Sequence, residues 1–274
     1  MLSYIQYQPS SLLARYIECY WIFKVPLMAA SVVERLIPGG RVELMINLGH
    51  SMHFLANDKL EQGDLIDQVH VMGQRNRIYY AKSSGEMYML GARFKPGGIH
   101  AFTRLPASEL LNQVISAEDV LGGTLKGWKN RLREKKTDAE QIALLDLLMQ
   151  QLVQYTTTEW NDCTKIIDII RQDNVLSVNE LCDENESYYK KLERSFLKYV
   201  GYTPKHYYRI VRFNKALRQM QFNQKSLTAI SHDCDYYDQS HFIKDFRQFT
   251  GTTPRQFQSE THHIADFLIS QQPV

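Results

Sequence analysis

The chain has 274 residues, of which 44% are hydrophobic and 23% charged, and its formal net charge is +2. These values are ordinary for a globular protein, and the length allows two domains that each bury a substantial core. No apolar run approaches the roughly 18 residues needed to span a bilayer, and residues 1–11 lack the basic start and apolar core of a secretion signal. We therefore expect a cytoplasmic protein with no membrane partner, and the four singly placed cysteines fit that reducing compartment.

Residues 1–125 are predicted to form mostly strands and turns. Short runs rich in Val, Ile, Tyr, Phe and Met alternate with breaks made of Gly, Asn, Asp and Ser. These runs predict an antiparallel sheet or a small barrel. The run 12–23 before them fits either a helix or an aromatic strand, and the sequence leaves that choice open. The predicted strands cover residues 41–49, 52–56, 70–74, 77–81 and 86–94.

A glycine-rich turn follows the last predicted strand. Arg93, Lys95 and His100 surround Gly97 and Gly98 and could hold an anion, but a turn from strand to helix is the simpler interpretation. The histidines of this half are scattered without the spacing of metal ligands, so we expect no metal and no cofactor.

A helical region is predicted to begin near residue 100. Within it, residues 138–155 carry apolar side chains at helical spacing and predict a helix with one broad apolar face. This helix would pack on the sheet or pair between subunits. Its apolar face is formed by Ile142, Leu145, Leu148 and Leu152.

Residues 176–204 contain two short helical patterns separated by a polar break. The second pattern places Leu192 and Phe196 on one face, and Gly201 and Pro204 form a Gly-x-x-Pro stop after it. This is the plan of a helix-turn-helix unit. In such units the second helix lies in the major groove of DNA, and its N-terminal residues contact base edges.

One helix is predicted over residues 205–222. Pro204 suits the first turn of this helix, and no Gly or Pro interrupts it. The helix would be roughly 27 Å long at the standard rise. Successive major grooves on straight DNA lie about 34 Å apart, so either the DNA bends or one of two units joined by this helix fits it poorly.

Residues 226–258 repeat the helix-turn-helix plan about fifty residues later. Asp238 can cap the second helix of this copy, and Phe242 begins its apolar face. When Phe242 is aligned with Leu192, the stop at Gly251 falls within one residue of the earlier stop. Unrelated segments would rarely show this agreement, so we predict a tandem pair of units.

Positive charge is concentrated between and within the two units. Residues 187–225 contain ten basic residues and one acidic residue, a local net charge of +9. Attraction to phosphate depends on such a local surface and not on the total charge of the chain. A solvated helix face would show the same charge run, and the flanking units favour DNA.

Taken together, these motifs resemble the AraC/XylS family of bacterial transcription regulators. The resemblance covers about residues 159–258, and the combined spacing is highly specific. It implies a DNA-binding domain of seven helices that contacts promoter DNA with both units, downstream of a sensing or dimerising domain. The N-terminal half is similar to an uncharacterised sensor-like domain. The motifs are Leu-x-Arg-x-Phe at 192–196, Gly-x-x-Pro-Lys at 201–205, Asp-Gln-Ser-His-Phe at 238–242 and Gly-x-x-Pro at 251–254.

Several positions depart from the family pattern. The family usually has Gly in each turn, where the backbone is left-handed, and here Glu186 and Asp235 stand there. Asp adopts this conformation more readily than Glu does. Cys182 and Ser231 replace the small Ala of each first helix, and Tyr188 replaces the Ser cap of the first unit. The first unit is therefore the more altered one.

The exposed starts of the second helices are expected to contact the DNA. Lys191 and Arg247 would hold phosphate, and the other residues would contact bases or neighbouring phosphates. The predicted DNA-contacting residues are Tyr189, Lys190, Lys191 and Arg194 in the first unit and Gln239, Ser240, His241, Lys244 and Arg247 in the second.

The sequence thus predicts an α+β protein. An N-terminal antiparallel sheet or small barrel with helices is followed by an all-α, seven-helix tandem helix-turn-helix domain. The predicted division is an N-terminal sensor or dimerisation domain over residues 1–156, a DNA-binding domain over 157–258 with units at about 176–200 and 226–250, and a tail over 259–274.

We expect a sequence-specific transcription regulator that is not an enzyme, because no phosphate loop, nucleophile elbow or metalloprotease motif is present. Its partners would be double-stranded promoter DNA, with RNA polymerase and a small-molecule effector as further candidates, and it would act as a monomer or a homodimer. The alternative is a small-molecule sensor or protein-interaction module with a degenerate helix-turn-helix. A barrel metalloenzyme fused to a regulator is a third hypothesis.

Overall fold

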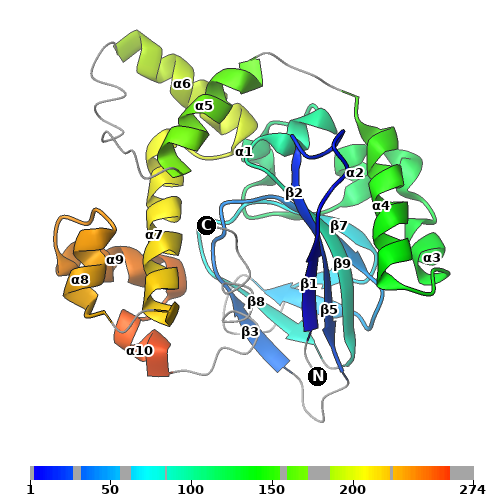
Figure 1. Ribbon diagram of the computed structural model, residues 1–274, viewed down its shortest axis with the longest axis horizontal. Helices are drawn as coiled ribbons and strands as arrows, with labels where there is room; N and C mark the ends of the chain where they lie inside the picture. Colours follow the sequence, from blue (N-terminus) through cyan, green and yellow to red (C-terminus); the bar gives the residue numbers. More distant parts are fainter. Residues whose placement is uncertain are drawn as a thin grey trace.

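The computed structural model describes residues 3–26, 32–55, 63–83, 85–154, 159–171, 186–222 and 225–259. Two antiparallel sheets and their covering helices form the N-terminal part, and the helices beyond residue 159 form the C-terminal part (Figure 1). The predicted α+β class is confirmed. Among the described residues, no helix combines the length and the apolar character required to cross a membrane.

The larger sheet has six strands and the smaller one four, and every pairing is antiparallel. The five strands predicted from sequence are confirmed as β4, β5, β7, β8 and β9. In sheet order, the larger sheet contains β1 (Ser3–Tyr7), β2 (Ile17–Val25), β9 (Met87–Phe94), β4 (Glu43–Asn47), β7 (Val69–Met72) and β10 (Val114–Ser116). The smaller sheet contains β3 (Val32–Leu36), β8 (Tyr79–Ser83), β5 (Met52–Leu55) and β6 (Asp64–Ile66).

Strand β2 answers the question that the sequence left open at residues 12–23. Its side chains alternate between two cores: Tyr20 and Ile22 face a core shared with the helices, and Trp21 and Phe23 face the smaller sheet. Because both faces are covered, the strand is a nearly continuous apolar run without visible alternation. Opposite Trp21, Gly91 supplies no side chain, which leaves room for the indole ring.

The predicted turn at residues 95–98 is confirmed, and Gly97 adopts φ of 80° there. Short helices follow it, and then comes the predicted long helix, α4, whose capping box joins Thr137 and Glu140. The helices of this part are η1 (Gly98–Ala101), α1 (Ala107–Leu110), α2 (Ala117–Leu121), η2 (Gly123–Leu125), α3 (Trp128–Arg133) and α4 (Asp138–Leu152).

Six helices of the C-terminal part lie in the described residues. The predicted linker helix over residues 205–222 is confirmed as α7. The first helix predicted for the first unit, together with Cys182, lies outside the described residues. The six helices are α5 (Glu159–Arg171), α6 (Glu186–Tyr199), α7 (Pro204–Phe222), α8 (Leu227–Asp233), α9 (Gln239–Thr250) and α10 (Pro254–Ser259).

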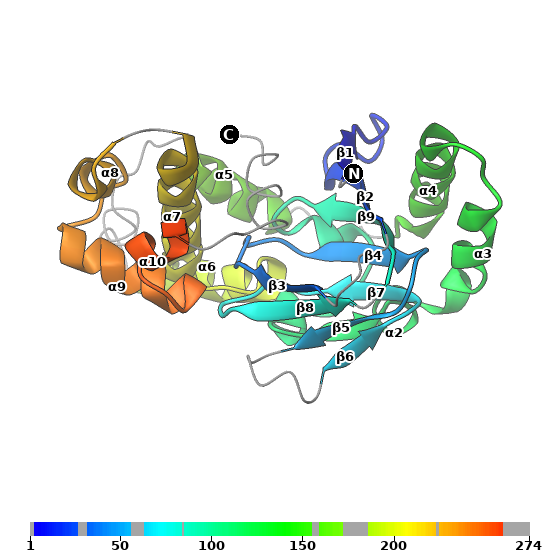
Figure 2. The ribbon, with the colours of Figure 1, turned by 90° about the horizontal axis from the view of Figure 1, so that it is seen from below.

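The two parts share one buried core and several polar contacts. Figure 2 shows α6 and α7 beside the strands, with α8 and α9 on the far side of α7. The His100 imidazole lies 2.7 Å from the Lys198 carbonyl, and the Tyr202 hydroxyl donates to the Arg75 carbonyl at 2.6 Å. The Asn214 amide donates to the Pro38 carbonyl at 3.2 Å. The N-terminal part, through η1 and the segments after β3 and β7, is therefore in direct contact with α6, α7 and the turn between them.

Candidate DNA interface and an apolar pocket

The second helix-turn-helix unit has complete local capping. Ser226 accepts a hydrogen bond from the backbone N–H of Ala229 at the start of α8, and Asp238 accepts one from His241 at the start of α9. Between the helices, Asp235 has φ of 55°. This confirms the expectation that an aspartate replaces glycine at the left-handed position of the turn.

The apolar face predicted for α9 is fully buried. Phe242, Phe246 and Phe249 have no exposed surface, and the last two rings pack against Phe213 of α7. Tyr236 of the turn packs edge-on against Phe242. The recognition helix is therefore held rigidly against α7, as a DNA-contacting element requires.

The opposite face of α9 carries the predicted contact residues. Ser240, Lys244 and Arg247 are exposed and lie four and three positions apart, which places them on one face. Gln239 and His241 are half-buried: the side-chain amide oxygen of Gln239 accepts a hydrogen bond from the Thr228 hydroxyl at 3.0 Å, and the His241 ring packs edge-on against Tyr236. The two residues expected to determine sequence specificity are thus held in place by the neighbouring helix and turn.

In the first unit, α6 presents its basic residues away from its buried side. Lys190, Lys191 and Arg194 are exposed and Tyr189 is half-buried, whereas Leu192 on the other face is buried. Burial of these three basic residues would have favoured a degenerate unit, and they are exposed instead. Pairing of these cations with acids at residues 183, 184 or 186 would also have favoured a degenerate unit, but residues 183 and 184 and the side chain of residue 186 lie outside what the structure describes.

The basic run over residues 187–225 is less positive at its surface than the sequence suggested. Arg209 and Arg212 both donate to the Asp245 carboxylate at 2.8 Å, and Lys225 pairs with Asp233 at 2.5 Å. These acids lie beyond residue 225, so a count along the chain missed them. The charge count of +9 therefore overstates what this segment offers to phosphate.

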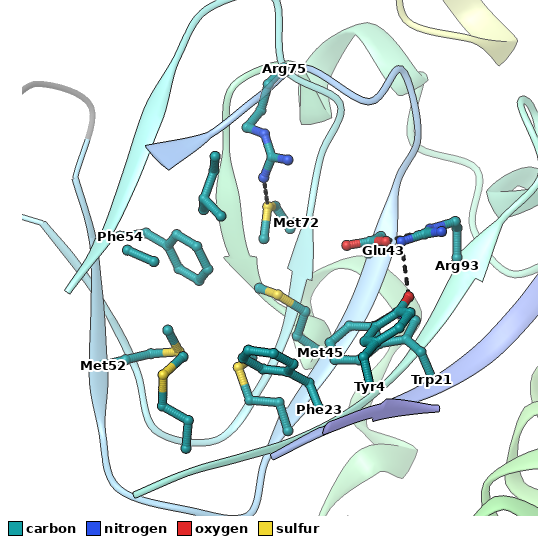
Figure 3. A pocket seen from close by; sticks show the side chains of 14 residues that line it. Tyr4, Trp21, Phe23, Glu43, Met45, Met52, Phe54, Met72, Arg75 and Arg93 are labelled. Carbon is teal, nitrogen blue, oxygen red and sulfur yellow. Dashed lines mark hydrogen bonds and ion pairs between the residues drawn. The ribbon is translucent and has the colours of Figure 1, made fainter. Parts of the chain in front are cut away.

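A cavity that is open to solvent lies between the two sheets (Figure 3). Its volume is about 580 Å³ when the solvent at its mouth is included. Its wall is mostly apolar and includes the aromatic rings of Trp21, Phe23 and Phe54. Five methionines also line it: Met45, Met52, Met72, Met87 and Met89. Flexible thioether side chains adapt to irregular apolar shapes.

Polar groups gather at one end of this cavity. Arg93 donates to the Glu43 carboxylate at 2.7 Å and to the Tyr4 hydroxyl at 3.2 Å. Burial lowers the pKa of Arg93, but Glu43, through its charge and its hydrogen bond, together with Tyr4 and Cys19 outweighs burial and raises the pKa above its ordinary value. Arg75 lies across from this pair, as Figure 3 shows, and its guanidinium donates to the Ile37 carbonyl and contacts the Met72 sulfur.

Two family models match the chain. A helix-turn-helix domain matches residues 181–260, and a domain of unknown function (DUF6597) matches residues 5–116. The HTH-type transcriptional regulator ArgR of Pseudomonas aeruginosa is 31% identical over 85 residues, which are 31% of this chain and 26% of that protein. The chain carries an AraC/XylS-type helix-turn-helix domain.

Two further similar proteins extend this comparison. The HTH-type transcriptional activator RhaS of Pectobacterium atrosepticum is 31% identical over 75 residues, 27% of each protein. The ToxT structure from Vibrio cholerae has a TM-score of 0.47 and 8% identity, covering 87% of this chain and 96% of that one. The matches to the curated relatives span only about a quarter of their length. The resemblance to the AraC/XylS family predicted for the C-terminal part is confirmed at the level of this domain.

Sequence reasoning missed two features near these sites. Tyr237, directly before the Asp238 cap, is 92% exposed, although its neighbour Tyr236 is buried. The tyrosine pair gave no signal of which ring faces solvent. The second feature is Arg75, which follows a strand in the sequence and has no nearby motif. Only the fold brings it to Arg93 and to the wall of the cavity.

Proposed function

We propose that this protein is a sequence-specific, DNA-binding transcription regulator of the AraC/XylS type whose N-terminal part receives a signal. The observation that carries the proposal is α9: a capped helix, rigidly packed through its phenylalanines, with Ser240, Lys244 and Arg247 exposed on one face. Such a helix can place its N-terminal half in a major groove. The division at residues 1–156, 157–258 and 259–274 belongs to this proposal.

Each unit contributes two kinds of contact to the proposed interface. Arg247 and Lys191 are long exposed cations that would hold phosphate, which adds affinity without sequence preference. Bases or nearby phosphates would be contacted by Gln239, Ser240, His241 and Lys244 in the second unit and by Tyr189, Lys190 and Arg194 in the first. Double-stranded promoter DNA is the proposed partner, with RNA polymerase and a small-molecule effector as further partners of a monomer or homodimer.

The first test selects bound fragments from the source genome and titrates them at several salt concentrations. We expect a small set of promoter fragments to be retained and log affinity to fall linearly with log salt, because binding releases counterions from the DNA. Failure to bind any fragment, or binding that salt does not change, would contradict the proposal and favour a sensor whose helix-turn-helix no longer binds DNA.

Two substitutions separate the two kinds of contact. Lys191→Ala should weaken binding to all sequences similarly and reduce the salt dependence by about one phosphate contact. Gln239→Ala should cost about 1–3 kcal/mol on the preferred sequence and little on others. Gln258→Ala, an exposed glutamine on α10, is the matched control and should change neither. If Gln239→Ala loses the same binding affinity on preferred and unrelated DNA, Gln239 does not contribute to sequence specificity.

A further inference from the structure

The polar end of the cavity holds more positive than negative charge. Glu43 is paired with Arg93 at 2.7 Å, which neutralises one guanidinium. No carboxylate among the described residues is paired with Arg75. In the part of the chain that the structure describes, its guanidinium donates to the neutral Ile37 carbonyl and contacts the Met72 sulfur. The residues that line the cavity therefore carry one uncompensated positive charge.

Two donors at this end have no acceptor within the described residues. The Nε atom of Arg75 and the Nη1 atom of Arg93 are buried and make no hydrogen bond. A buried donor without a partner costs about 1–3 kcal/mol, and more when it is charged. Burial accordingly lowers the pKa of Arg75 from its ordinary value. An anion beside Arg75 would compensate its charge and could accept a hydrogen bond from it.

The remainder of the cavity suits an apolar group. Trp21, Phe23 and Phe54 provide aromatic surface, and the methionines of the wall can adjust to a ligand's shape. Apolar surface on a ligand gains about 25 cal/mol for each Å² that leaves water. The ligand that fits both ends has one negative charge and an apolar body.

We propose that the cavity between the two sheets binds an organic monoanion with an apolar body, such as an alkyl or aryl carboxylate, and that Arg75 receives its anionic group beside Arg93. Two hydrogen bonds from a guanidinium to a carboxylate are charge-assisted and specific in direction. The apolar wall and the charged end of the cavity together determine this ligand class.

Arg75 also connects the cavity with the DNA-binding helices. Its backbone carbonyl accepts from Tyr202 in the turn between α6 and α7, and its side chain donates to Ile37. The residue after Ile37, Pro38, accepts from Asn214 of α7. A carboxylate that draws the guanidinium away from Ile37 would change both segments that contact α6 and α7. This regulatory step rests on the proposed function, whereas binding of the anion does not.

The binding test uses purified full-length protein without DNA. Straight-chain carboxylates of six to twelve carbons and 4-phenylbutyrate are titrated by calorimetry and by tryptophan fluorescence, to which Trp21 of the cavity wall contributes. For each acid, the alcohol and the amine of the same skeleton are the matched probes. At least one acid should bind at least tenfold more tightly than its alcohol, and the amine should bind least. Absence of binding by every acid up to millimolar concentration, or equal binding of acid and alcohol, overturns the proposal.

Variants then assign the anion to Arg75. Arg75→Gln should reduce the difference between acid and alcohol at least tenfold, while Arg77→Gln, an exposed arginine two residues along, should leave it unchanged. Ala81→Leu fills the cavity and should weaken acid and alcohol together. If Arg75→Gln keeps the full preference for the acid, the assignment to Arg75 is wrong. The wild-type comparison of acid, alcohol and amine still decides the ligand class if this variant does not fold.

A final arm separates this inference from the proposed function. The acid that binds most tightly is added to a salt-controlled DNA titration of the wild type and of Arg75→Gln. A change in DNA affinity of at least threefold, lost in Arg75→Gln, supports regulation through Arg75. Binding of the acid by a protein that binds no DNA refutes the proposed function and leaves the ligand assignment standing. Unchanged DNA affinity in the presence of bound acid refutes only the regulatory step.

Discussion

The Asp245 carboxylate is the polar centre of the second helix-turn-helix unit. Its side chain is 4% exposed and accepts hydrogen bonds from Arg209 and Arg212 of α7. Arg212 also lies over the Tyr236 ring at 3.9 Å and donates to the Asp235 carbonyl. One carboxylate on α9 therefore orders two arginines of α7, and one of these holds the turn before the recognition helix.

Asp245→Asn should destabilise the protein by about 3 kcal/mol, because it leaves two largely buried guanidinium groups without their counter-charge. Urea unfolding measures this cost. Asp233→Asn, which removes the exposed partner of Lys225, is the control and should change stability little. If the two variants lose the same small amount, the buried pair does not stabilise the unit.

The Asp245 carboxylate should also make the stability of the protein depend on pH. Burial raises the pKa of Asp245, but hydrogen bonds from Arg209 and Arg212 outweigh it and hold the pKa below its ordinary value. A carboxyl group whose pKa is lowered by folding adds stability above the unfolded pKa of about 3.9, and this stability is lost as the pH falls further. Asp245→Asn should therefore show a smaller loss of stability than the wild type between about pH 4 and pH 3.

At the scale of elements, the two Gly-x-x-Pro stops have the same geometry but different surroundings. Gly201 ends α6 with φ of 80°, and Gly251 ends α9 with φ of 76°. A methyl group on Gly201 would lie 1.4 Å from the Gln74 amide nitrogen and 2.8 Å from the Ala107 carbonyl oxygen. On Gly251 its nearest contact would be at 3.9 Å. Only the first stop is packed tightly against the N-terminal part.

This pair allows a matched substitution. Gly251→Ala should cost about 1–2 kcal/mol, because alanine is strained in the left-handed region. Gly201→Ala should cost at least about 1 kcal/mol more, since it also displaces the Gln74 amide from its buried hydrogen bond with Ala107. Urea unfolding of both variants checks the difference. Equal costs would show that the contact between α6 and the N-terminal part contributes no stability.

The sequence predicted elements well where one local pattern was sufficient. The cap at Asp238 and the left-handed Asp235 depend on neighbouring residues alone, and both are confirmed. Strand β2 was left open because its two buried faces hide the alternation, and β1, β3, β6 and β10 were missed because three to five residues show little period. The other contacts of the site could not be predicted, because their residues lie far apart in the sequence. The fold alone brings Arg75 and Arg93 to the wall of one cavity and pairs Arg212 with Asp245.

At the scale of the whole molecule, α7 sets the distance between the two proposed recognition helices. It has 19 residues and is therefore about 28 Å long, whereas successive major grooves lie about 34 Å apart. Packing of α7 against α9, and contacts of α6 and α7 with the N-terminal part, resist a change in this distance. Either the DNA must then deform, or one of the two units must lose its contact with the DNA.

We expect bound promoter DNA to be bent by on the order of 40°, an amount that costs a few kcal/mol in DNA deformation. Fluorescence energy transfer between dyes on the two DNA ends measures the bend. Lys191→Ala, which weakens the first unit, should reduce both the bend and the affinity, because the second unit alone can lie on straight DNA. Gln258→Ala should leave both unchanged. Straight DNA in a complex whose affinity still depends on Lys191 would contradict the spacing argument, since both units would then be engaged without any deformation of the duplex.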